Sequence, residues 1–132
     1  MISNKSIIID NISRDQDNRG SILSIVDEQV KNVSIISCNP GSIRSNHYHL
    51  NDFHYMYVLE GEIDYLIKKI DSDYVEYLKV KKGENIFTPP MEIHATFFPI
   101  KTTLIVSSLN SRDSETYEKD TVRVDFVNEN NI

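Results

Sequence analysis

Short runs of apolar residues recur along the whole chain and are separated by turn residues. Ile63, Tyr65 and Ile67 occupy every second position, which is the period expected of a strand with one buried face. Turn chemistry such as Glu-Gly-Glu at 60–62 and Asp-Ser-Asp at 71–73 closes such runs. The pattern predicts strands at Ile7–Ile9, Ser21–Val26, Val33–Cys38, Phe53–Leu59, Ile63–Ile70, Tyr74–Val80, Ile86–Thr88, His94–Phe98 and Thr102–Leu109.

Many short strands at this spacing predict an all-β sandwich or barrel. A helical period is found only weakly, around Ser111–Lys119. With 132 residues the chain is the length of one domain, 1–132, with its core at about 20–110. Residues 111–132 are a polar segment followed by a C-terminal edge or swapped strand, because Thr121–Val127 alternates again. That strand either returns to the sheet or pairs with a second chain, and a homodimer is expected.

Composition narrows the classes of partner. The formal net charge is −6 and no basic stripe is present, which argues against nucleic acid but leaves a small anionic ligand open. The lone Cys38 excludes an internal disulfide and fits a reducing compartment. The first residues form no long apolar run, so neither a secretory signal nor a membrane span is predicted. A cytoplasmic protein is expected.

Four histidines form the most informative pattern in the sequence. His47 and His49 are two residues apart, so on a strand both project to the same face. His54 follows across a turn, and His94 comes forty residues after it. Such a set fits a cage inside a small barrel that holds one divalent transition metal: Zn, Ni, Fe, Cu or Mn. Each histidine taken alone also fits an ordinary hydrogen-bonded position in a core.

The spacing of these residues resembles the first motif of the cupin superfamily. That motif runs Gly, five residues, His-x-His, three or four residues, Glu, six residues, Gly. Gly41, His47, His49, His54 and Gly61 match every interval, with His54 where the family usually has Glu.

The second cupin motif is matched in part. It runs Gly, five residues, Pro-x-Gly, two residues, His, three residues, Asn. Gly83, Pro89 and His94 stand at the right separations, while Met91 replaces the Gly and Phe98 replaces the Asn. The resemblance implies a cupin fold, a double-stranded β-helix or jelly-roll barrel, with the four histidines as metal ligands.

The loss of the glutamate has a chemical consequence. Four neutral imidazoles leave the full +2 charge on the ion, which strengthens its pull on an anionic or enolate ligand. Zn, Ni or Cu become relatively more favoured than with a carboxylate in the set. A mainly structural metal remains an alternative, because four protein ligands can close a tetrahedral site.

The segment from Arg44 to His49 narrows the resemblance further. It is similar to the Arg-Gly-x-His-x-His signature of small cupins from bacterial surface-polysaccharide pathways, among them sugar-nucleotide 3,4-ketoisomerases and capsule-synthesis epimerase/reductases. The resemblance implies that Arg44 binds pyrophosphate, and that His47 and His49 are metal ligands or proton carriers. Ser45 departs from the Gly, Leu50 from a frequent Lys, and the ketoisomerases do not depend on a metal.

The favoured function is isomerisation or epimerisation of a sugar or nucleotide sugar by metal- and histidine-assisted proton transfer. His47, His49 and Tyr48 are the candidate catalytic residues. Arg44 and three tyrosines that could stack on a ring, Tyr55, Tyr57 and Tyr65, are the candidate substrate-binding residues. Plain filling of the β-sheet is the alternative role for these tyrosines. A non-catalytic metal- and sugar-binding module and an Fe or Ni dioxygenase are the alternative functions.

Overall fold

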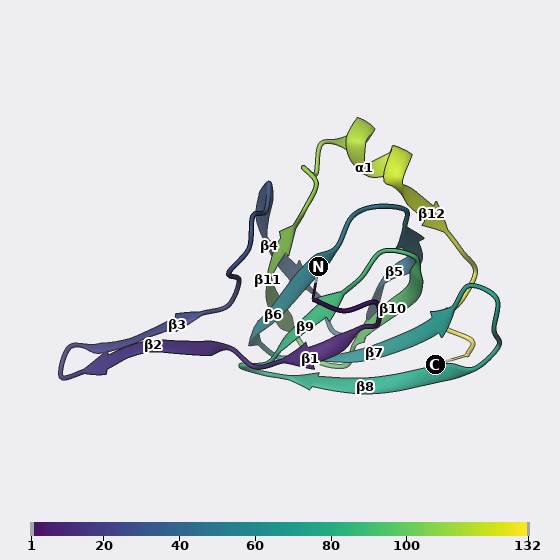
Figure 1. Ribbon diagram of the computed structural model, residues 1–132. Coiled ribbons are helices and arrows are strands. Elements are labelled where there is room, and N and C mark those ends of the chain that lie inside the picture. Colours follow the sequence, from purple (N-terminus) through teal and green to yellow (C-terminus); the bar gives the residue numbers. More distant parts are fainter. Residues whose placement is uncertain (1, 132) are drawn as a thin grey trace.

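Two five-stranded antiparallel sheets face each other and enclose the core, as Figure 1 shows for the computed structural model, which describes residues 2–131. The first sheet has the order β1 (Ile7–Ile9), β9 (Asn85–Thr88), β6 (His54–Glu60), β11 (Thr102–Ser108) and β4 (Asn32–Cys38). The second has the order β12 (Thr121–Arg123), β5 (Ser42–His49), β10 (Glu92–Phe98), β7 (Glu62–Lys69) and β8 (Val75–Lys81). The all-β jelly roll predicted from the sequence is confirmed.

The core lies between the inner faces of these sheets. Ile63, Tyr65 and Ile67, predicted to share one face of a strand, are all buried on β7. Val58 and Phe98 are fully buried in the same apolar cluster. Each such side chain stabilises the fold by on the order of 1.5–3 kcal/mol. Alternation along the strands therefore sets which side chains point into the barrel, including those of the site described below.

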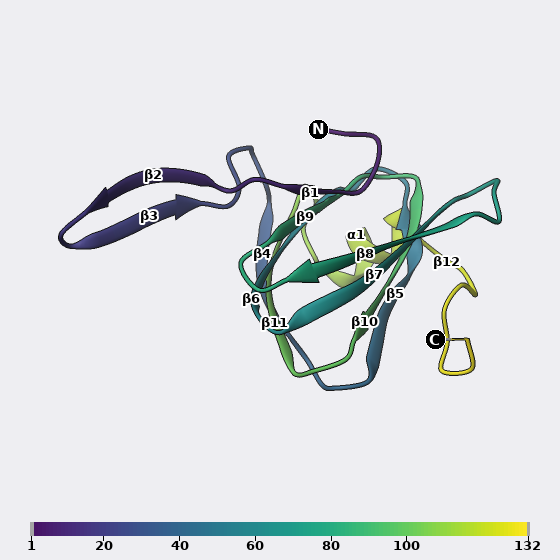
Figure 2. The same cartoon turned by 90° about the horizontal axis from the view of Figure 1, so that it is seen from below.

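A hairpin projects away from the barrel. Its strands, β2 (Ile12–Asp17) and β3 (Gly20–Ser24), form a separate two-stranded sheet that extends well clear of the other two in both views (Figures 1 and 2). The sequence predicted the second strand but not the first. The first reads Ile-Ser-Arg-Asp-Gln-Asp and is exposed throughout, so it carries no apolar alternation.

The C-terminal segment crosses one end of the barrel and returns to the second sheet. Helix α1 (Ser114–Asp120) begins at Asp113, whose side chain accepts a hydrogen bond from the Thr116 backbone N–H and caps the helix. The strand β12 that follows pairs with β5 of the same chain. The C-terminal end of the molecule thus forms part of the wall around the inner face of β5.

The predicted strand Thr121–Val127 is confirmed only as far as Arg123. Beyond it the chain is held by Asn46, whose backbone oxygen accepts from the Val124 N–H and whose side chain bonds both backbone polar groups of Val127. These contacts replace the sheet ladder over 124–127. The homodimer stays a prediction, since the tail that suggested it pairs within its own chain. Across residues 2–131, none of the helices has the length and apolar character needed to span a bilayer.

Candidate metal centre and ligand cavity

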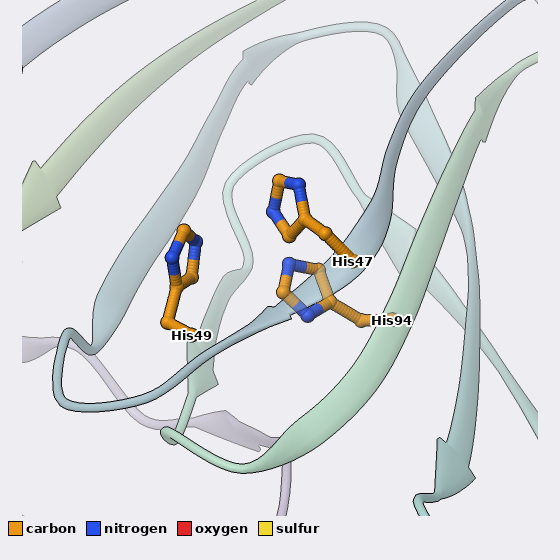
Figure 3. Close-up of side chains that lie close together, drawn as sticks. All are labelled: His47, His49 and His94. Atoms are coloured by element: carbon orange, nitrogen blue, oxygen red, sulfur yellow. The ribbon is translucent and has the colours of Figure 1, made fainter. Parts of the chain in front are cut away.

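Three of the four histidines meet on the inner face of the second sheet (Figure 3). His47 and His49 are two residues apart on β5, and His94 on β10 is the direct cross-strand partner of His47. The ring centroid of His47 lies 4.6 Å from that of His49 and 4.8 Å from that of His94. The strand period and the strand pairing together produce this cluster, as the sequence predicted for these three residues.

A β-bulge next to the cluster aims the His47 side chain. The pairing of β5 with β10 passes from His94–His47 to Ala95–Ser45, so Asn46 is an extra residue on β5. Ser45 and Asn46 both have positive φ, 73° and 57°. The bulge breaks the strict alternation of this strand, and the adjacent residues Arg44 and Ser45 both line the same cavity as His47.

One nitrogen of each clustered histidine is buried without a hydrogen-bond partner among the described residues: Nδ1 of His47, Nε2 of His49 and Nε2 of His94. Nitrogens of the three side chains lie within 4.8 Å of one another. A buried polar atom without a partner is costly and requires an explanation. Such atoms on three rings of one cluster are explained by a ligand, such as a metal ion, that the three side chains share.

The partners of the other ring nitrogens fix two of the tautomers. His94 Nδ1 lies 3.2 Å from the backbone oxygen of Glu92, which can only accept, so Nδ1 carries the proton. Thr121 Oγ1 donates to the Tyr117 backbone oxygen and therefore accepts from His49 Nδ1 at 3.2 Å. Both Nε2 atoms are then bare lone pairs. A metal ligand whose second ring N–H is held by a neighbouring acceptor has this same arrangement.

The three imidazoles are neutral near pH 7. Burial lowers the pKa of His47 to about 2, of His49 to about 4 and of His94 to about 3, and the other histidines nearby disfavour the charged form further. Because metal ligation requires the deprotonated imidazole, protons do not compete for these nitrogens at neutral pH. The donor set fits Zn, Ni, Fe, Cu or Mn, and His47, His49 and His94 are the residues that would hold such an ion.

His54 lies beside this cluster but has a different partner. Its ring centroid is 4.7 Å from that of His49, and its Nε2 lies 3.0 Å from Oδ2 of the buried Asp52. Burial raises the pKa of the Asp52 carboxyl, but the hydrogen bonds that it accepts from His54 and from the Asn110 backbone N–H, together with the nearby histidines, outweigh burial, so the pKa is lowered overall. Asp52 is therefore ionised and His54 Nε2 is the donor.

A cavity of about 310 Å³ opens beside the histidines. His47 and His54 line it together with Tyr117, and apolar residues such as Met56 and Phe98 form its floor. Three arginines from three different segments also line it: Arg44, Arg112 and Arg123. The Arg112 guanidinium lies 5.0 Å from the centroid of the Tyr117 ring, within cation–π range. A site that combines cations, imidazoles and apolar surface can hold an anionic ligand with an apolar or ring portion.

The structure brings Arg44 to this cavity but not the tyrosines expected to bind substrate. Tyr55 packs against Phe53 and Phe87 in a separate cluster, with its hydroxyl bonded to Glu28, and Tyr65 is buried with its hydroxyl bonded to Ser6 and Thr88. Tyr57 and Tyr48 are half-buried and line none of the cavity. Period two explains this, because Tyr48 lies between His47 and His49 and must point to the opposite face.

Sequence reasoning missed the residues that the C-terminal segment contributes. Tyr117 places its ring 5.5 Å from His49 and 6.3 Å from His47, between centroids, and Arg112 and Arg123 flank it in the cavity wall. Asp120 accepts from the backbone N–H groups of both Asn51 and Asp52, which fixes the turn between β5 and β6. The only local signal was weak helical periodicity over 111–119.

Comparison with known families identifies the chain. The model of the polysaccharide biosynthesis C-terminal domain family matches residues 15–121. The chain belongs to this family. A search of curated protein sequences gave no match.

Solved structures with the same fold include sugar 3,4-ketoisomerases and a capsular polysaccharide assembling protein, the groups that the resemblance in the sequence implied. The TDP-quinovose 3,4-ketoisomerase WlaRB of Campylobacter jejuni superposes with a TM-score of 0.74 at 18% identity over 92% of this chain and 94% of its own. The sugar 3,4-ketoisomerase QdtA of Thermoanaerobacterium thermosaccharolyticum, solved with TDP, gives 0.72 at 18% over 93% and 90%. The capsular polysaccharide assembling protein CapF of Staphylococcus aureus gives 0.67 at 18% over 89% and 33%.

The backbone explains two glycines that this chain lacks, one in the second cupin motif and one in the Arg-Gly-x-His-x-His signature. Ser45 and Met91 stand at motif glycine positions, and both have positive φ, 73° and 64°. An L-residue in this region costs roughly 1 kcal/mol relative to glycine. Met91 keeps the turn because its N–H donates to the His49 backbone oxygen at 2.7 Å.

Replacing Met91 with glycine is therefore expected to stabilise the protein by up to about 1 kcal/mol, because strain is relieved while the exposed side chain contributes little packing. Urea denaturation of wild type and Met91→Gly measures the difference. Met91→Ala, which keeps the Cβ and the strain, is the matched control and is expected to give no gain. Equal stability of the two variants would contradict this explanation of the motif glycine.

Proposed function

We propose that this protein is a nucleotide-sugar isomerase or epimerase, whose reaction takes place in the cavity beside the histidine cluster. The observation that carries the proposal is the convergence, in one cavity, of His47 and His54 with Arg44, Arg112 and Arg123. His54 supplies an imidazole outside the metal cluster that can take part in proton transfer, and arginines bind diphosphates. Solved structures of similar fold include QdtA in complex with TDP-4-keto-6-deoxyglucose and the TDP-fucose-3,4-ketoisomerase WlaRA. This similarity supports a nucleotide sugar as the substrate of the present protein.

We propose further that the cluster of His47, His49 and His94 holds one divalent metal ion. Their three partnerless buried nitrogens support this assignment. A bound divalent ion would polarise a carbonyl oxygen and favour the enolate form of a keto sugar. The chain's own residues would bind the diphosphate through arginines, exclude water with the apolar floor and exchange a proton with the carbon next to the carbonyl.

The arginines are expected to dominate affinity for the nucleotide. The chain has a net charge of −6, so a diphosphate must find its cations locally, and Arg112 and Arg123 sit on the C-terminal segment next to the cavity. We expect Arg123→Gln to weaken binding of TDP by about tenfold, because one charge-assisted contact is removed. Isothermal titration calorimetry with TDP measures this. Arg19→Gln on the hairpin is the control, and equal affinity in both variants would contradict the assignment.

Turnover tests the proposed reaction directly. In a 3,4-ketoisomerisation C3 and the O3 hydroxyl of the 4-keto sugar each lose a proton, while C4 and O4 each gain one, so the carbonyl moves from C4 to C3 without an external oxidant. Incubation of the protein with TDP-4-keto-6-deoxyglucose in D₂O, followed by proton NMR, is expected to show loss of the C3 proton signal. Arg44→Gln is expected to slow this loss, whereas Arg19→Gln is not. A C3 signal that persists with wild-type protein, loaded with each of the five metals in turn, would contradict isomerisation of this substrate.

A further inference from the structure

The four histidines of this chain are not equivalent in their hydrogen bonding. His49 and His94 give their Nδ1 protons to the oxygens of Thr121 and of the Glu92 backbone, with a carboxylate oxygen of Asp120 3.7 Å from His49 Nδ1, and both keep an Nε2 without a partner. His54 instead gives its Nε2 proton to a carboxylate, Asp52. The two arrangements point the free nitrogens of these rings at different surroundings.

Position separates His54 from the metal cluster. The nitrogens that lie within 4.8 Å of one another belong to His47, His49 and His94, and His54 joins no such group in residues 2–131. The buried atoms without partners include one nitrogen from each of those three histidines and none from His54. A carboxylate partner by itself would suit a metal ligand as well. The positions of the ring nitrogens, and not the type of hydrogen-bond partner, therefore distinguish His54 from the candidate metal ligands.

Asp52 keeps His54 where it is. Its Oδ2 accepts from His54 at 3.0 Å, its Oδ1 accepts from the Asn110 backbone N–H at 3.0 Å, and its own N–H donates to Asp120 at 2.9 Å. Both carboxylate oxygens and the backbone of Asp52 are thus fixed, and the residue is 3% exposed. With Nε2–H committed to this anchor, Nδ1 is the atom that accepts hydrogen bonds when the ring is neutral, and the His54 side chain lines the ligand cavity.

We propose that His54 is not the fourth metal ligand of this chain but a substrate-contacting residue, held by Asp52 so that its Nδ1 accepts a hydrogen bond from the ligand in the cavity. Replacement of the usual cupin glutamate by histidine then moves this position out of the metal's ligand set. The three-histidine set leaves the ion with fewer protein ligands than a closed structural site requires. The inference rests on the proposed metal centre and nucleotide-sugar ligand.

Metal affinity and the spectrum of the Co²⁺-loaded protein test this assignment independently of activity. His54→Gln keeps an N–H for Asp52 and is expected to bind Co²⁺ within about threefold of wild type, with unchanged d–d absorption. His94→Gln is the matched control and is expected to weaken Co²⁺ binding by about 100-fold or more. Mutation of a residue that only hydrogen-bonds to a metal ligand already lowers metal affinity about 10- to 100-fold, and loss of the ligand itself should cost at least as much. His54→Gln is also expected to weaken binding of the keto sugar nucleotide to the loaded protein, measured by calorimetry.

Three results would overturn the inference. A loss of Co²⁺ affinity in His54→Gln as large as in His94→Gln, or a changed d–d spectrum, would make His54 a ligand and leave the proposed function standing. Unchanged affinity of His54→Gln for the keto sugar nucleotide would show that His54 does not contact the substrate, and would leave the assignment of the metal ligands standing. Wild-type protein that binds no metal would overturn both the inference and the metal part of the proposed function.

Discussion

Lowering the pH from 7.5 to 5.5 is expected to destabilise the metal-free protein by on the order of 4 kcal/mol. The pKa values of His47, His49 and His94 are lowered by burial to about 2, 4 and 3, so these side chains stay neutral in the folded state across this range. In the unfolded chain each has a pKa near 6.5 and takes up a proton as the pH falls. Proton uptake by the unfolded state alone favours unfolding by about 1.4 kcal/mol per histidine over these two pH units.

The direction of this effect follows from which state binds more protons. Stability contributed by the three neutral imidazoles is fully present above pH 6.5 and falls progressively below it until the folded pKa values are reached. Urea denaturation of chelator-treated protein at the two pH values measures the loss. His47→Gln, which removes one of the three groups, is expected to reduce the pH dependence by about a third. Equal stability at pH 7.5 and 5.5 would show that the cluster is not buried and neutral.

Replacing Gly61 with alanine is expected to cost about 3 kcal/mol or more. Gly61 has a φ of +91°, and a Cβ there would lie 2.3 Å from Thr102 Oγ1 and 2.5 Å from the Lys101 backbone oxygen. Thr102 is fully buried and its hydroxyl donates to the backbone oxygen of Glu62, the first residue of β7, so its side chain cannot move without losing this bond. Strained φ and a clash with backbone therefore add.

Gly83 provides the matched control. It has a similar φ of +85°, but a Cβ there would meet nothing within 4 Å. Gly83→Ala is expected to cost only about 1 kcal/mol, the price of the backbone conformation. Thermal or urea unfolding of both variants gives the comparison. A similar loss for the two would mean that the close approach to Thr102 does not restrict this turn.

Sequence periodicity predicted most of the barrel because burial and alternation coincide there. Ile63, Tyr65 and Ile67 are the clearest case, and the same period put His47 and His49 on one face. The strand Ile12–Asp17 was missed because it buries nothing. The strand predicted to run to Val127 ends at Arg123, because the distant Asn46 takes over the backbone partners of the tail.

Much of the candidate site could not be predicted because it depends on contacts between distant segments. Tyr117 and Arg123 carry no motif, and only the return of the C-terminal segment to β5 brings them to the cavity. Asp52 looked like a turn residue beside His54, and its role emerges only from hydrogen bonds with Asn110 and Asp120. Conversely, aromatic type alone suggested Tyr55 and Tyr65 as substrate contacts, although both are committed to the core.

The central claim, that the buried nitrogens of His47, His49 and His94 hold one metal ion, is tested most directly by metal content. Elemental mass spectrometry would be applied to protein purified without an affinity tag, alongside the His47→Ala/His94→Ala double variant. We expect about one equivalent of Zn, Ni, Fe, Cu or Mn in the wild type and none in the variant, because two of three ligands are lost. A wild type that is metal-free and takes up none of these ions when they are supplied would contradict the account.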